Sequence, residues 1–230
     1  MPFINWKSIC LMGSFLCAVS QTPSFAADAP ARDRAALVNG AAITAAEFHT
    51  ELNRLERQRG TGKNSPDPSE MARLKKEALE SLITREILYQ EALREGIKVP
   101  GAAVDAELNG LKKQFATGSE FTATLTSMGL SEASVRAQVE KGMAARRLID
   151  EKFGKKVKVS DAEVGYYYED HQDEFKVPVG KPATFTPLSE VREKIRLKIK
   201  QDRVDRELNP YLKRLREQAK VEIMLDEEGE

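Results

Sequence analysis

Histidine is the side chain best suited to acid–base chemistry or metal binding near neutral pH, and this chain has two, His49 and His171. His49 has glutamates two residues away on either side, a spacing that places neither on the same helix face. His171 lies in an acidic stretch, residues 170–174, which could hold a cation or form a solvated acidic surface. The pattern favours the solvated surface, and we predict no catalytic or metal-binding histidine.

The motifs of other catalytic sites are missing from the sequence. It has no glycine-rich phosphate loop, nucleophile elbow or His-Glu-x-x-His motif. Residues 60–63, Gly-Thr-Gly-Lys, lack the preceding strand and the spacing of a phosphate loop, so we interpret them as a flexible loop. The many glutamates offer carboxylate pairs for acid–base work, but no pair is singled out. We therefore expect no catalytic residue, no metal, no cofactor and no enzymatic activity.

Both cysteines lie in an N-terminal segment with the features of an export signal. Lys7 is the only charge in residues 1–26, an apolar stretch runs from Ile9 to Val19, and small residues precede a cleavage point after Ala26. The apolar stretch is shorter than the roughly 20 residues of a membrane-spanning helix, which favours a cleaved signal peptide over an anchor. We expect a periplasmic protein whose mature form contains no cysteine.

Charge is balanced over the whole chain but unevenly distributed. The 36 basic and 36 acidic residues argue against nucleic acid as a partner. Residues 161–175 hold six acids and no lysine or arginine, whereas residues 191–220 hold eleven bases and five acids. A basic amphipathic segment is typical of contact with a membrane surface or a polyanion. We favour the alternative, in which the basic segment lies against the acidic one within the fold.

Apolar side chains that could bind another polypeptide gather around short segments punctuated by glycine. Methionine is flexible and polarisable, and it therefore suits a surface that accepts varied apolar partners. Core packing is the simpler explanation for each residue alone, whereas together they predict the lining of an open groove. The predicted peptide-binding residues are Phe115, Phe121, Leu125, Met128 and Met143.

Helical periodicity and capping residues divide most of the chain into amphipathic helices. Capping boxes begin at Thr44 and Ser160, and prolines and glycines interrupt the pattern at a linker, residues 179–186. The last helix, residues 187–219, would span roughly 50 Å, so it must bridge or protrude. Pro210 should kink it. The predicted helices lie within residues 44–60, 67–96, 104–115, 121–129, 131–153, 160–175 and 187–219.

Two short strands are expected at opposite ends of the mature chain, residues 36–39 and 221–224. Neither is long enough to be stable alone, so we expect them to pair and to join the two ends over the helical core. The predicted fold class is all-α, mainly helical, with this small two-stranded pairing. A long helix attached to the N-terminal strand could also exchange between two chains, which leaves a homodimer open.

Four stretches resemble the periplasmic foldases of the SurA/PpiD/PrsA type. In this order, after a signal peptide, they cover nearly the whole mature chain. They are Val38-Asn39-Gly40 with Ile43-Thr44 and Glu47-Phe48; Leu82 to Ala92 ending in Gly96-Ile97; Val159-Ser160-Asp161 with Tyr167-Tyr168, Glu174-Phe175 and Pro178; and Val191 to Leu215 ending in Val221-Glu222-Ile223.

The resemblance implies a SurA N-domain-like chaperone module that lacks the parvulin-type prolyl isomerase domain of its relatives. In that family the isomerase domain follows the helix that here ends near Phe175, but in this sequence the chain reaches its last helix within about ten residues. We therefore expect one helical chaperone domain formed by residues 27–178 and 187–225, and no catalytic residue is carried over.

Three functions follow as hypotheses. The first is an ATP-independent periplasmic chaperone, a holdase that binds unfolded or newly exported polypeptides through an apolar groove. The second is a non-catalytic adaptor for one dedicated envelope or export complex. The third is a residual peptidyl-prolyl isomerase.

Overall fold

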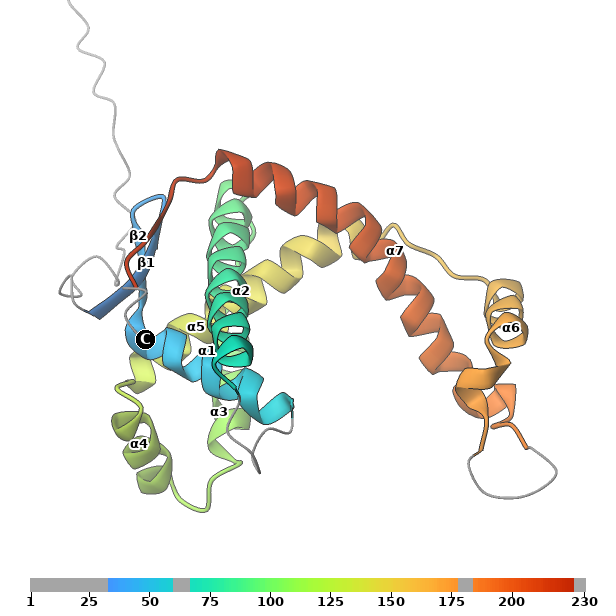
Figure 1. Ribbon diagram of the computed structural model, residues 1–230, viewed down its shortest axis with the longest axis horizontal. Helices are drawn as coiled ribbons and strands as arrows, with labels where there is room; N and C mark the ends of the chain where they lie inside the picture. Colours follow the sequence, from blue (N-terminus) through green and yellow to red (C-terminus); the bar gives the residue numbers. More distant parts are fainter. Residues whose placement is uncertain (1–32, 60–66, 178–183, 226–230) are drawn as a thin grey trace, which may run out of the picture.

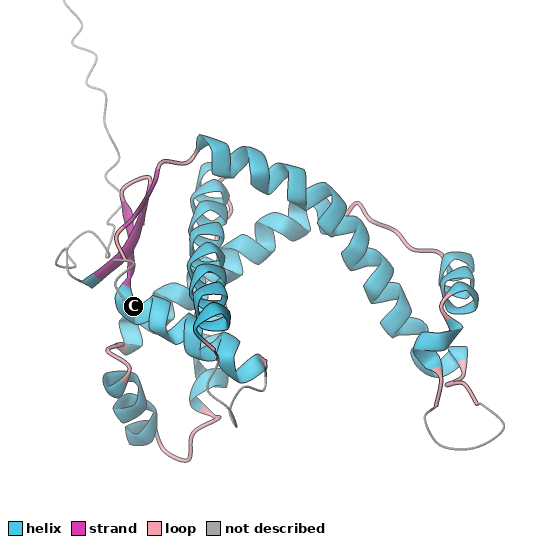
Figure 2. Ribbon diagram, in the orientation of Figure 1, coloured by secondary structure: helices cyan, strands magenta, loops and turns pink. Residues whose placement is uncertain are grey.

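A computed structural model describes residues 33–59, 67–177 and 184–225. This part of the chain forms seven α-helices, two short helical segments of other types and three strands (Figure 2). The predicted signal peptide, residues 1–26, lies outside the described residues. In chain order the elements are β1 (Arg34–Val38), β2 (Ala41–Thr44), α1 (Ala45–Gln58), α2 (Pro68–Arg94), α3 (Gly101–Lys112), α4 (Gly118–Ser127), α5 (Glu132–Ile149), the π-helix η3 (Asp150–Gly154), α6 (Asp161–Asp170), the 3-10 helix η4 (Gln172–Phe175), α7 (Leu188–Gln218) and β3 (Val221–Ile223).

The sheet has the strand order β2-β1-β3, and both pairs are antiparallel. Ala36 in β1 pairs with Ile223 in β3, which confirms the predicted pairing of the two terminal strands. The expectation of only two strands was wrong. Asn39 and Gly40 both have positive φ, 51° and 86°, and such a two-residue turn folds the chain directly back as β2.

Several helix ends lie at the capping residues that the sequence indicates, whereas α3 and α4 each begin three residues before the predicted range. Thr44 and Ser160 each form the predicted capping box with the glutamate three residues later. Asp67 caps α2 by accepting from the amide of the third helical residue. At the other end of α2, Gly96 has a φ of 71° and the amide of Ile97 donates back to the helix over 2.8 Å.

Three apolar cores lie in one part of the molecule, which we call the body: the sheet, α1 to α5, η3 and the C-terminal turns of α7. The first core lies between the sheet, α1 and α2. The second joins the C-terminal half of α2 to α5, and the third joins α3, α4 and α5. Figure 1 shows α2 at the centre of the body, where it belongs to the first two cores.

A fourth core lies in a separate part, which we call the arm: α6, η4 and the N-terminal half of α7. It is built on Val164, Phe175 and Ile195, all buried. The arm extends away from the sheet at the far end of α7 (Figure 1). The acidic and basic segments identified in the sequence meet here.

The helix α7 connects arm and body, as its predicted length required. Its 31 residues span about 46 Å at 1.5 Å per residue. Ile195 belongs to the arm core, whereas Leu212 and Leu215 pack against cores of the body. The helix is continuous through Pro210.

Buried carboxylates fix the helices of the body to one another. Glu86 of α2 is 4% exposed and accepts from Lys141 Nζ of α5 at 2.7 Å. Glu91, also of α2, accepts from the hydroxyl of Tyr211 in α7. Glu51 of α1 accepts from a serine of α2. Removing Lys141 would leave the buried charge of Glu86 without a cation, so this pair strongly favours the observed packing of α5 on α2. Glu91 and Glu51 are also paired with arginines of their own helices, so their contacts with Tyr211 and with the serine add hydrogen bonds between helices.

The attachment of α7 to the body is completed by the π-helix η3, which continues α5. The ring of Phe153 meets that of Tyr211 edge to face, with centroids 5.5 Å apart. Lys152 Nζ lies 5.2 Å from the Tyr211 centroid and 2.9 Å from a carboxylate oxygen of Glu95. Tyr211 is therefore held on two sides, directly before Leu212, which packs on the second body core.

The predicted linker is only partly described. Its flanks pair in an antiparallel bridge between Lys176 and Phe185, and the amide of Val177 donates to the carbonyl of Thr184 over 2.8 Å. Residues 178–183 lie outside the described residues. The two described flanks thus meet at the tip of the arm, next to Phe175.

Ion pairs between α6 and α7 hold the arm together. Asp161 Oδ1 accepts from Arg192 at 3.1 Å and from Arg196 at 2.6 Å. Glu163 pairs with Arg203, whose other terminal nitrogen donates to the carbonyl of Lys158 over 2.7 Å. The hydrogen bond from Arg203, with those from Ser160, lowers the pKa of Glu163 from 4.5 to about 2. These contacts confirm that the basic segment lies against the acidic one within the fold.

The side chain of Asn39 generates a first prediction. Asn39 Nδ2 donates to Gln90 Oε1 over 2.8 Å, and Asn39 Oδ1 accepts from the Lys220 amide over 2.8 Å. Replacing Asn39 with alanine should lower the free energy of unfolding by about 1–3 kcal/mol, because two hydrogen bonds that join β1, β3 and α2 are lost. Urea unfolding followed by far-UV circular dichroism measures this change in the free energy of unfolding.

Asn53→Ala, at an exposed position of α1, is the matched control, and it should change the free energy of unfolding by less than about 0.5 kcal/mol. Equal effects would contradict the predicted role of Asn39.

Glu163 generates a second prediction. Because its pKa is lower in the folded arm, its contribution to stability is complete above pH 4.5 and is lost as the pH falls toward 2. Glu163→Gln should therefore destabilise the arm at pH 7 and flatten the response of the arm to acid. Near-UV circular dichroism reports on the arm, since α6 holds three of the five tyrosines.

Glu169→Gln, at the exposed opposite end of α6, is the control for this experiment and should keep the acid response of the unmodified chain. If Glu163→Gln and Glu169→Gln lose tyrosine ellipticity at the same pH as the unmodified chain, the pair with Arg203 does not stabilise the arm.

Candidate peptide-binding surfaces

The predicted groove residues lie around α4, in the third core of the body. Phe121 and Leu125 are buried there, 3% and 7% exposed, together with residues of α3 and α5. Phe115 precedes α4 and is half-buried, with its ring edge to face on Phe121 at a centroid distance of 5.2 Å. The structure thus brings Phe115, Phe121 and Leu125 together in one cluster.

Met128 and Met143 are placed differently from these three residues. Both are half-buried, and neither belongs to the apolar cluster beneath α4. Met128 is the C-cap of α4, whereas Met143 lies in the middle of α5. Phe121 and Leu125 are covered by neighbouring helices, and Phe115, Met128 and Met143 retain surface that a ligand could touch.

Each of the two histidines lies against an aromatic ring. His49 is exposed, and its ring meets Phe48 at a centroid distance of 5.5 Å. The ring of His171 stacks on Tyr167 with centroids 4.0 Å apart, and its Nδ1 lies 3.0 Å from the Tyr167 carbonyl oxygen. Among residues 33–59, 67–177 and 184–225, no group of three metal-ligating side chains could hold a metal ion.

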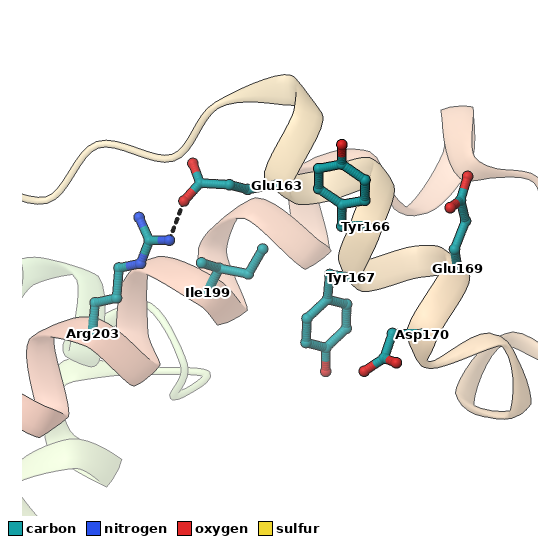
Figure 3. Close-up of a pocket in the computed structure, with 7 residues that line it drawn as sticks. All are labelled: Glu163, Tyr166, Tyr167, Glu169, Asp170, Ile199 and Arg203. Carbon is teal, nitrogen blue, oxygen red and sulfur yellow. Dashed lines mark hydrogen bonds and ion pairs between the residues drawn. The ribbon is translucent and has the colours of Figure 1, made fainter.

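A second surface lies in the arm, where α6 and α7 enclose an open hollow of about 610 Å³. Figure 3 shows that α6 contributes two tyrosines and three carboxylates, and that α7 contributes Ile199 and Arg203. The lining residues are Glu163, Tyr166, Tyr167, Glu169, Asp170, Ile199 and Arg203. The hollow therefore combines an aromatic and aliphatic floor with an acidic rim.

The rotation of α6 against α7 decides which tyrosine faces the solvent. Val164 is fully buried against α7, and Tyr168 packs on the same core while its hydroxyl donates to the Thr186 carbonyl over 2.8 Å. Tyr166 lies two residues from each of them along the helix and is 71% exposed. Three consecutive tyrosines on a helix cannot all face one side, because successive residues are about 100° apart.

The tyrosine hollow was not predicted from the sequence. The six acids of residues 161–175 were identified there, but the three consecutive tyrosines among them were assigned no role in binding. Figure 3 shows Ile199 of α7 beside the tyrosines, with the Glu163–Arg203 pair at one end of the hollow. Ile199 and Arg203 reach this place because α7 packs on α6, although both residues lie more than 30 positions after Tyr167 in the chain.

Residues 8–149 match the SurA-like N-terminal domain family. Proteins named Chaperone SurA are similar to the chain: 32% identity over 158 residues in Chromobacterium violaceum, 30% over 164 in Chromohalobacter salexigens and 32% over 158 in Alcanivorax borkumensis. These alignments cover 67%, 70% and 67% of this chain, but only 36%, 37% and 36% of those proteins. The chain thus spans little more than a third of the length of these relatives.

A solved structure described as a SurA-like chaperone of Campylobacter jejuni is also similar, with a TM-score of 0.49 at 15% identity, over 83% of this chain and 98% of that one. No helix within the described parts of the chain is long and apolar enough to cross a membrane. The family match includes every element from β1 to α5, which is most of the body. The chain belongs to the SurA-like N-terminal domain family.

Proposed function

We propose that this chain is an ATP-independent periplasmic chaperone that holds unfolded or newly exported polypeptides. The observation that carries the proposal is the match of residues 8–149 to the SurA-like N-terminal domain family. The relatives named Chaperone SurA support the same function. We further propose that residues 27–178 and 187–225 act as one helical domain, exported by a signal peptide cleaved after Ala26, and that it works without catalysis.

The division of the apolar surface into four small cores suits such a function. No single core is large enough to bury every apolar side chain at its margins, so half-buried residues such as Phe115 remain accessible. A client would cover these margins with its own apolar side chains, each contributing about 1.5–3 kcal/mol before the entropy of ordering is subtracted. Several weak contacts of this kind allow binding and release without a nucleotide.

The proposed client contacts in the body are the five residues predicted from the sequence, in two roles. Phe115, Met128 and Met143 would touch the client, because they retain accessible surface. Phe121 and Leu125 would support that surface from below, because they are buried in the cluster under α4. Truncating Phe121 would therefore remove about 3–5 kcal/mol of stability and would say little about binding.

The function predicts that the purified chain suppresses aggregation of a chemically unfolded client, measured by light scattering at increasing molar ratio. The double variant Phe115→Ser with Met128→Ser should require a several-fold higher ratio for the same suppression, because two accessible apolar contacts are lost. Leu93→Ser is the matched control, since it removes an exposed leucine, 47% exposed, from the C-terminal turn of α2.

Full client aggregation at a several-fold molar excess of the chain would contradict the chaperone function. Two further measurements distinguish the alternative functions, an adaptor and an isomerase, from the chaperone. One stoichiometric partner recovered from periplasm, with no suppression of aggregation, would instead indicate an adaptor. A faster rate of proline-limited refolding would indicate an isomerase.

A further inference from the structure

The tyrosine hollow of the arm leaves an aromatic surface without an internal partner. Tyr166 is 71% exposed although it lies between two residues that pack on the arm core. Tyr167 has one face covered by the stacked ring of His171, and Ile199 packs only at the margin of the same core. Together with the 610 Å³ hollow, these side chains form a surface that can receive an apolar or planar group.

The acidic rim of the hollow is also uncompensated. Glu169 and Asp170 lie in the last turn of α6, where the helix dipole already places negative charge and where α6 has no basic residue. Within the described parts of the chain, no lysine or arginine forms an ion pair with either. The contact of Asp170 with His171, 3.5 Å, is ionic only when the ring is protonated. The single arginine of the hollow, Arg203, is already paired with Glu163.

We propose that the tyrosine hollow docks polypeptide segments in which lysine or arginine stands next to an apolar or aromatic side chain. The cation would lie against the exposed face of Tyr166 and close to the carboxylates of Glu169 and Asp170, since a tyrosine face and a carboxylate both attract a cation. The neighbouring apolar side chain would cover Ile199 and the accessible part of Tyr167. An acidic segment would meet the same carboxylates and be repelled.

This inference rests on the proposed function in one respect, namely that the ligand is a polypeptide, and it adds selection by charge. The two surfaces differ in chemistry. The α4 surface presents Phe115 and Met128, which distinguish clients by apolar area alone. The hollow combines aromatic rings with unpaired carboxylates, so it favours cationic segments and its affinity should fall as salt is added.

Binding of labelled peptides to the full chain, measured by fluorescence anisotropy, tests the proposal. One peptide is composed of Phe, Leu and Lys, and its match has every Lys replaced by Glu. The Lys peptide should bind at least about tenfold more tightly, and raising the salt should reduce that preference. The double variant Glu169→Gln with Asp170→Asn should bind the Lys peptide about fivefold more weakly, and Tyr166→Ser should weaken it by a similar factor.

A matched control separates the hollow from the overall charge of the chain. Glu107→Gln with Glu217→Gln removes two exposed acids, one from α3 and one from the C-terminal end of α7, and it should leave the affinity unchanged. All four positions of the two double variants and Tyr166 are exposed, so the variants should keep the circular dichroism spectrum of the parent. Glu169 and Asp170 thus differ from the control acids by location and not by number of charges.

Three outcomes would overturn the proposal: equal binding of the two peptides, unchanged affinity in the variants of the hollow, or equal loss in the control. The proposal would also be overturned if the chain forms a dimer that dissociates in these variants, because the hollow would then bind a second copy of the chain. If the chain suppresses client aggregation but the hollow shows no charge preference, only this inference fails. If the Lys peptide binds as expected but aggregation is not suppressed, the proposed holdase function is wrong, whereas the proposed binding of cationic segments in the hollow is still supported.

Discussion

The length of α7 is the constraint on which the rest of the structure depends. A helix of 31 residues is about 46 Å long, and none of the four apolar cores extends along all of it. It therefore shares its apolar side chains between two places, with Ile195 in the arm and Leu215 in the body. A chain arranged in this way cannot close into one compact core, and accessible apolar surface at the margins is the direct consequence.

Polar contacts fix the relative positions of the helices, which the small apolar cores alone do not determine. In the body, Glu86 and Glu91 are buried and each is bound by a side chain from another helix, so α5 and α7 have one favoured position on α2. In the arm, Asp161 and Glu163 pair with arginines of α7. Within the described residues, no lysine or arginine of α7 forms an ion pair with Glu169 or Asp170, the C-terminal acids of α6.

Features set by neighbouring residues could be predicted from the sequence, and features set by distant contacts could not. The capping boxes and the long last helix were predicted, because hydrophobic period and cap chemistry are local. The pairing of the terminal strands is the exception: it joins residues far apart in the chain, and it was predicted because neither short strand would be stable alone. The strand β2 was missed, although Asn39-Gly40 is a typical hairpin turn, because the short run after it begins with alanines. Which face of α4 is buried depends on packing against helices far away in the chain.

Native-state hydrogen exchange along α7 tests most directly whether the apolar core is divided between arm and body. Separate cores should open as separate cooperative units. The amides around Ile195 should therefore open with a lower free energy than those around Leu212 and Leu215, and the two groups should merge only as denaturant approaches the global transition. A single opening free energy along the whole helix would contradict the account, because it would mean that arm and body form one cooperative core.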